Sequence, residues 1–231
     1  MTSMGAQRMI VVTHWTALLL ACAMSMLVAV MLFHLDMTFG FKMPMPLLII
    51  GQTFLWIVVS AMIMSFVEHQ VHARLMHRPN FLSKRYASYK RVFEAHAITH
   101  HAHYSKIFTD EPVAPGEDKE IRLTVRKAPM KAMPFAALLS FLSIQAGLTF
   151  VAIVTFHHWI WNNIHLEMHK PENRFFSEWP VYKFLARHHY LHHRYQNKNF
   201  NVVFPFADYL LGTNVHATKQ DKEEMVALGL Y

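Results

Sequence analysis

Three long stretches without Asp, Glu, Lys or Arg limit the folds that this chain can adopt. They run from Met9 to Leu35, from Leu47 to Val67 and from Pro134 to Ile164. A helix crosses a bilayer with about 20 apolar residues, so each of the first two stretches predicts one transmembrane helix. The third would measure about 46 Å as one straight helix, which is too long for one crossing and too short for two comfortable ones.

The first stretch has an alternative interpretation as a cleaved signal, because Leu20-Ala21-Cys22 resembles a lipoprotein cleavage site. The apolar run continues through Met31, Leu32 and Phe33, well beyond that site. Since the apolar core of a signal is short, the longer run favours a transmembrane helix.

Two basic regions flank the third stretch, one from Glu68 to Lys131 and the other from Lys170 to Tyr231. The positive-inside tendency places both in the cytoplasm. The third stretch must then leave and return on the same side, which predicts a short helical hairpin that bends near Gln145-Ala146-Gly147. The net charge of +7 is explained better by anionic lipid headgroups than by nucleic acid, so no nucleic-acid partner is expected.

Histidine is the unusual residue, with 18 copies against a single cysteine, Cys22. Metal chemistry here must therefore use imidazole and carboxylate ligands, which excludes thiolate clusters. Most histidines fall in four groups near the ends of the apolar stretches. The groups are His69, His72 and His77; His96, His100, His101 and His103; His157, His158, His165 and His169; and His188, His189, His192 and His193. His14, His34 and His216 lie outside them and are expected at interfaces or on the surface.

The spacing within these groups suits metal binding, because side chains three or four residues apart share a helical face. This applies to His96 with His100, to His165 with His169, and to His189 with His192 and His193. His72 and His77 are five apart, so they must serve different ions or sit on a distorted turn. A loose metal-binding tract is the alternative, but aromatic residues such as Phe93, Trp161 and Tyr190 are interleaved with the histidines.

The motifs His72-x4-His77, His96-x3-His100-His101, His165-x3-His169 and His189-x2-His192-His193 resemble the histidine boxes of the fatty acid hydroxylase and sterol desaturase superfamily. Its members are membrane di-metal oxygenases. The similarity covers about residues 68–213 and ends with Asn199, Asn201, Pro205 and Asp208. One departure is the second box, where three residues precede the double histidine and many relatives have two. This departure leaves open which of His100, His101 and His103 bind metal.

The resemblance implies an all-α integral membrane protein with about four transmembrane helices and a cytoplasmic helical cap, in one domain spanning 1–231. It also implies two iron ions, with dioxygen as co-substrate. Ten histidines match the family's metal ligands: His72, His77, His96, His100, His101, His165, His169, His189, His192 and His193. No catalytic residue beyond these ligands is expected.

The activity that the resemblance implies is O2-dependent hydroxylation or desaturation of a C–H bond in a lipid, such as a fatty acyl chain or a sterol-like lipid. Electrons are expected from an external ferredoxin- or cytochrome-like donor, since the chain leaves no room for a redox domain beside the membrane core. The basic cytoplasmic face suits an acidic donor. Residue spacing alone also allows a non-catalytic metal-binding or metal-transporting membrane protein.

Several polar residues close to the histidines could support a metal site. Ligating histidines usually donate their second ring N–H to a carboxylate, a carbonyl or water. Candidates for this role, with a solvated surface charge as the alternative, are Glu68, Glu94, Glu167 and Asp208. Tyr104, Tyr190 and Tyr195 could line the site or anchor at the lipid headgroups.

Overall fold

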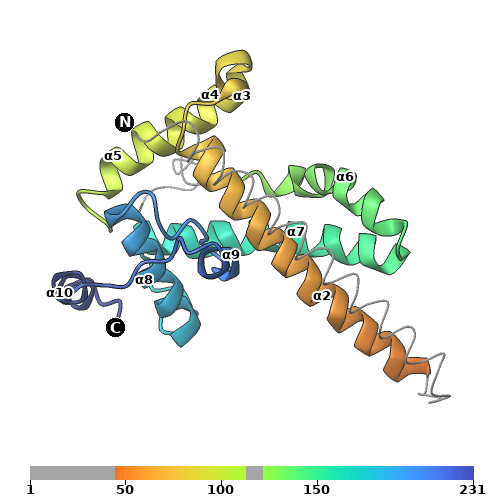
Figure 1. Cartoon of the computed structure of the whole chain (residues 1–231). Coiled ribbons are helices and arrows are strands. Elements are labelled where there is room, and N and C mark those ends of the chain that lie inside the picture. Colours follow the sequence, from red (N-terminus) through yellow and green to blue (C-terminus); the bar gives the residue numbers. More distant parts are fainter. Residues whose placement is uncertain (1–44, 113–121) are drawn as a thin grey trace.

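The computed structural model describes residues 45–112 and 122–231 (Figure 1). Within these two ranges every regular element is a helix and none is a strand. The all-helical fold class predicted from the sequence is therefore confirmed for the described residues. The first predicted membrane helix, Met9 to Leu35, lies outside them, as do His14 and His34.

The longest helical unit begins with α2 (Met45–Gln70) and continues directly into the π-helical turn η1 (Val71–Met76). Residues Pro46–Met76 are long and apolar enough to cross a membrane, and only 22% of the most apolar window is buried. A core helix of a soluble protein would be mostly buried. Among the described residues no other helix meets the same criteria of length and composition, so this part of the protein contains one candidate membrane span.

The third apolar stretch forms a helical hairpin, preceded by the short 3-10 helix η4 (Val125–Lys127). Its arms are α6 (Ala128–Ser140) and α7 (Ile144–His169), which pack along each other (Figure 1). The turn lies at 141–143, so the bend predicted near Gln145-Ala146-Gly147 falls inside the first turn of α7.

Gly147 serves the close packing of the two arms and not the bend itself. A Cβ at this position would lie 2.7 Å from the carbonyl oxygen of Ala136 and closer still to the Ser140 hydroxyl. On α6, Ala128, Ala132 and Ala136 are buried. Their spacing of four places them on one face of the helix. Small side chains on both arms therefore let α6 and α7 approach closely.

The remaining helices gather where α2 and α7 end, whereas α6 and the start of α2 lie at the opposite end of the molecule (Figure 1). Those that follow α2 and η1 are α3 (Phe81–Arg85), α4 (Ala87–Phe93), the π-helical turn η2 (Glu94–His100) and α5 (His101–Tyr104). Those that follow α7 are α8 (Pro180–Arg194), α9 (Phe206–Leu210) and α10 (Lys219–Ala227).

Local sequence explains where several of these helices begin. Pro180 occupies the first turn of α8, where its missing N–H costs nothing. Thr218 and Asp221 form a capping box at the start of α10, each side chain accepting a backbone N–H of the other residue.

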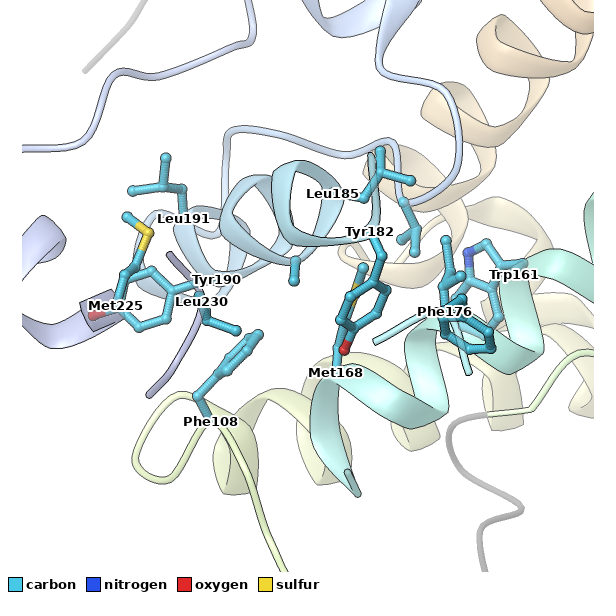
Figure 2. Packing of buried hydrophobic residues seen from close by; sticks show 13 residues of the cluster. Phe108, Trp161, Met168, Phe176, Tyr182, Leu185, Tyr190, Leu191, Met225 and Leu230 are labelled. Carbon is cyan, nitrogen blue, oxygen red and sulfur yellow. The ribbon is translucent and has the colours of Figure 1, made fainter. Parts of the chain in front are cut away.

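An apolar core holds α8 and α10 against the last turns of α7 and the loop after α5 (Figure 2). Trp161 and Met168 contribute from α7, Tyr182 and Leu185 from α8, and Met225 from α10. Because α8 carries three of the predicted ligands, this core determines their position relative to α7.

Candidate metal centre

All ten histidines predicted as ligands lie together in two groups of five, and each group offers ring nitrogens within 4.8 Å of one another. The first group consists of His72, His77, His96, His101 and His192. The second group consists of His100, His165, His169, His189 and His193. Neither group includes a carboxylate or the thiol of a cysteine. The described part of the chain can therefore hold metal ions on imidazole nitrogen alone.

Two π-helical turns bring histidines five residues apart onto one face. In η1 the amide of His77 donates to the carbonyl of His72, and at the end of η2 the amide of His101 donates to that of His96. A helix with hydrogen bonds between residues five apart has more residues per turn than an α-helix. The distorted turn considered for His72 and His77 is thus what the structure contains.

The grouping differs from the pairing expected from α-helical spacing in two places. His96 pairs with His101 in the first group, while His100 belongs to the second. On α8, His189 and His193 are four apart and share the second group, whereas His192 faces the first. Shared helical spacing therefore does not place His96 with His100, or His189 with His192, in the same group, although His189, His192 and His193 together do face the pair of groups.

The ring nitrogens within the first group lie at hydrogen-bond distance from one another. Nε2 of His72 is 2.7 Å from Nε2 of His96, and Nε2 of His192 lies 3.0 Å from that of His77 and 3.1 Å from that of His101. In the second group, Nε2 of His189 lies 3.0 Å from that of His169 and 3.1 Å from that of His193. In every one of these pairs the facing atom is Nε2.

Backbone carbonyls orient three of the rings. Nδ1 of His72 donates to the Phe200 carbonyl, Nδ1 of His192 to Lys198 at 2.7 Å, and Nδ1 of His169 to Phe108 at 2.9 Å. A neutral imidazole has one N–H, so Nε2 of each of these rings carries a lone pair. These lone pairs point toward imidazole nitrogens of the same group, and imidazole nitrogen is a common ligand of zinc, copper, iron and nickel. The residues present therefore fit a bound metal ion in each group.

Burial keeps these histidines in the neutral form that binds metal. It lowers the pKa of His189 and His193 well below the ordinary 6.5, and the neighbouring histidines lower it further. The pKa values of His96 and His192 are lowered well below 6.5 for the same two reasons. At neutral pH these rings are therefore uncharged imidazoles, the form that binds a metal ion.

The two groups are immediate neighbours. The rings of His101 and His193 stack with centroids 4.3 Å apart, and those of His96 and His100 stack at 5.0 Å. Each stacked pair joins one member of the first group to one of the second. Since consecutive residues, His100 and His101, supply both groups, any two ions held there would lie side by side.

The four acidic residues proposed as partners of the ligand rings do not bond to any of the ten. Glu68 contacts His157 at 3.2 Å, Asp208 contacts His188 at 3.1 Å, and Glu167 pairs with Arg174. Glu94 is exposed and pairs with Lys90. The orienting acceptors found instead are the carbonyls of Phe108, Lys198 and Phe200. Sequence reasoning could not find these, because every residue type has a backbone carbonyl.

The segment Asn199 to Thr213 packs over the first group. Asn199 has a φ of 54°, a left-handed conformation that asparagine tolerates better than most residues, and its side chain donates to the His188 carbonyl at 3.0 Å. The Asn201 side chain donates to the Ser65 carbonyl at 2.8 Å. These buried amides connect the segment to α8 and α2, and so position the Phe200 carbonyl beside His72.

Asp208 anchors the same segment from α9. Burial would raise the pKa of its carboxyl, but hydrogen bonds from His188, Thr213 and the Asn201 amide outweigh that effect and leave it below the ordinary value. Asp208 is therefore a carboxylate at neutral pH.

The remaining candidate residues differ in whether they lie against a histidine group. His103 is exposed and pairs with Asp110 at 3.0 Å, and His216 is exposed outside both groups. Tyr104 is buried, and its ring lies 4.1 Å from that of His169, so it lines the site. Tyr190 and Tyr195 donate to Glu224 and Asp221 of α10 instead.

Comparison with known proteins adds no family assignment, because no protein-family model, no curated protein and no solved structure matches the chain.

Proposed function

We propose that this protein is a membrane oxygenase that hydroxylates or desaturates a C–H bond of a lipid, with one iron ion held in each histidine group. The proposal depends on one observation, the two adjacent groups of five histidines, nine of the ten buried, whose ring nitrogens lie within 4.8 Å of one another in each group. Two iron ions would supply the activation of dioxygen that attack on an unactivated C–H bond requires.

The number of donors supports iron over structural zinc. Structural zinc sites are almost always four-coordinate, and each group offers five imidazole nitrogens. Imidazole suits iron, copper and nickel as well as zinc. Five donors exceed what a structural zinc ion would use, and an iron ion would be held by these imidazole nitrogens.

The protein's own residues hold and orient these rings. The carbonyls of Phe108, Lys198 and Phe200 accept the Nδ1–H of one ring each, which directs Nε2 toward the ion and raises its basicity. Nine of the ten rings are buried, which limits the contact of both groups with bulk water. The protein thus supplies a preorganised site of the kind that oxidative chemistry needs.

The position of the first group favours a lipid as the substrate. His72 lies in the last turn of the candidate membrane span Pro46–Met76. The surface of α2 that leads to it is exposed and apolar, as at Ile50 and Phe54. A lipid chain lying along α2 would reach the first group without leaving an apolar environment.

An external donor would supply the electrons. Exposed basic residues lie between the first two boxes, among them Lys84, Arg85, Lys90 and Arg91 on α3 and α4. Their positive charge would attract an acidic ferredoxin- or cytochrome-like protein. We place this surface in the cytoplasm, following the positive-inside tendency of both basic regions.

Metal content tests the first part of the proposal. Protein produced with adequate iron should carry close to two metal ions per chain, because each group has a full set of donors. Purified protein that holds a heme, or no metal at any supply, would contradict the di-metal assignment. Zinc in place of iron would not, since imidazole sites readily take another divalent ion.

Lipid composition tests the activity. Cells that produce the protein should contain an oxidised lipid that is missing from cells without it. His192→Ala removes a donor of the first group and should abolish that lipid and reduce bound metal. His216→Ala is the matched control, an exposed histidine outside both groups, and should leave both unchanged. Full activity of His192→Ala would refute the oxygenase.

The same experiment separates the rival function. A protein with two bound metal ions and no effect on any lipid would be a non-catalytic metal-binding membrane protein. Transport of the ion across the membrane would appear as metal uptake that depends on His192, again without a lipid product.

A further inference from the structure

A pocket of about 390 Å³ lies between the loop after α5, the last turns of α8 and the end of α10. Its lining includes Tyr104, Ser105, Tyr190, His193 and Leu228. His193 belongs to the second histidine group, and the ring of Tyr104 packs on His169 of the same group. The pocket therefore borders the second group on the side of the loop after α5 and the end of α10.

The two groups differ in how closely they approach solvent. In the first group His77 is only partly buried. In the second group His100, His165, His169 and His189 are 0% exposed and His193 is 3% exposed. A metal ion needs a route into such a site. The first group has one at His77, and the second needs another.

His193 both lines this pocket and belongs to the second group. Its Nε2 faces the second group, at 3.1 Å from that of His189, while its Nδ1 is closed to solvent and has no hydrogen-bond partner among the described residues. A ligating histidine usually donates its second N–H to a carboxylate, a carbonyl or water. A small movement of the pocket wall would bring water to this atom of His193.

The pocket itself is polar enough to hold water. Ser105 lines it and donates to the His193 carbonyl at 3.2 Å. Tyr190, Arg194 and Glu224 line it as well, with the Tyr190 hydroxyl bonded to Glu224. Buried water needs two to four polar partners and enough room, and this pocket provides both.

We infer that the pocket is a water-filled route through which the second group takes up and releases a hydrated divalent cation, while the first group exchanges its ion independently at His77. The inference rests on the proposed metal binding. It requires that the two ions leave the protein at different rates, and that residues lining the pocket control only the slower one.

Release of ferrous iron to a coloured chelator tests this route. The full-length protein in detergent, loaded with two ferrous ions, should release them in two phases. Leu228→Trp fills the pocket and should slow the second phase by about tenfold or more, and Leu228→Ala should accelerate it. Val226→Trp is the control, because Val226 is 60% exposed on the same helix and does not line the pocket.

The outcomes separate this inference from the proposed function. Identical slow phases in Leu228→Ala and the unmodified protein would overturn the route, even if Leu228→Trp failed to fold. A change confined to the fast phase would also overturn it. In both cases metal content and lipid oxidation would still support the oxygenase. Failure to bind two ions at the loading step would instead refute the di-metal site, and the route with it.

Discussion

Asp208 is connected to the first histidine group through the backbone of Phe200, although its carboxylate contacts none of the ten histidines. Its carboxylate accepts four hydrogen bonds, two on each oxygen. The donors are the Phe200 amide at 2.9 Å and the Thr213 hydroxyl at 2.7 Å on Oδ1, and the Asn201 amide at 2.7 Å and the His188 ring at 3.1 Å on Oδ2. The Phe200 carbonyl in turn accepts Nδ1–H of His72. Movement of the Phe200 peptide therefore moves a ring of the first group.

Asp208→Asn replaces one of these oxygens by an NH2 group that cannot accept. If that group faces the Phe200 amide and Thr213, two bonds are disturbed; if it faces His188, the imidazole can switch roles and one bond is lost. Hydrogen bonds to charged groups contribute about 1.5–3 kcal/mol each. The free energy of unfolding should therefore fall by about 1.5–6 kcal/mol, a large part of a typical total of about 5–15 kcal/mol.

The functional effect should be confined to one metal ion. Changes behind a ligating histidine typically weaken metal affinity by about 10–100-fold, so Asp208→Asn should weaken the first group by that factor and leave the second unchanged. Competition with a chelator measures both affinities. Thr213→Val, which removes one donor to Asp208, should give a smaller effect in the same direction if the asparagine variant does not fold.

Asp221→Asn is the matched control. Asp221 is equally buried and accepts from the Thr218 amide and the Tyr195 hydroxyl, but it caps α10 and leads to no ligand ring. Loss of a cap costs about 0.5–2 kcal/mol, and both metal affinities should be retained. Equal metal affinities in Asp208→Asn and the unmodified protein, or equal losses in both variants, would refute the connection through Phe200.

Two further predictions concern stability. Gly147→Ala should lower the free energy of unfolding in detergent by about 1–3 kcal/mol, because its Cβ meets the backbone of α6. Gly51→Ala, whose Cβ would meet no atom of the described residues within 4 Å, should be neutral or stabilise by up to about 1 kcal/mol. Equal effects would contradict the close packing of α6 on α7. The metal-free protein should lose stability as the pH falls below about 6.5. The reason is that the pKa values of His189 and His193 are lowered in the folded state, so the unfolded chain binds more protons. Thermal unfolding between about pH 8 and pH 5 measures this, and a flat profile would refute it.

Residue spacing and composition were enough to predict much of the described structure. The uncharged run from Leu47 to Val67 predicted a long apolar helix, and α2 contains all of it. The basic regions on both sides of the third run predicted a hairpin, and α6 and α7 form one. Such features are local, because hydrophobic length and charge are properties of a short segment. The predicted bend near Gln145-Ala146-Gly147 lies a few residues after the observed turn at 141–143, because Gly147 serves the packing of α6 on α7.

The set of ten histidines came from motif spacing and from the family resemblance, and the structure brings all ten together. Their division into two groups could not be predicted, because it depends on two π-helical turns and on contacts across the chain. An α-helical period assigns His100 to His96, whereas the π-turn assigns His101 to it. His72 meets His192 only because the apolar core under α8 holds that helix against α7. The acceptors behind the rings are backbone carbonyls, which no residue type reveals, so their positions follow from the packing of the segment Asn199 to Thr213 over the first group.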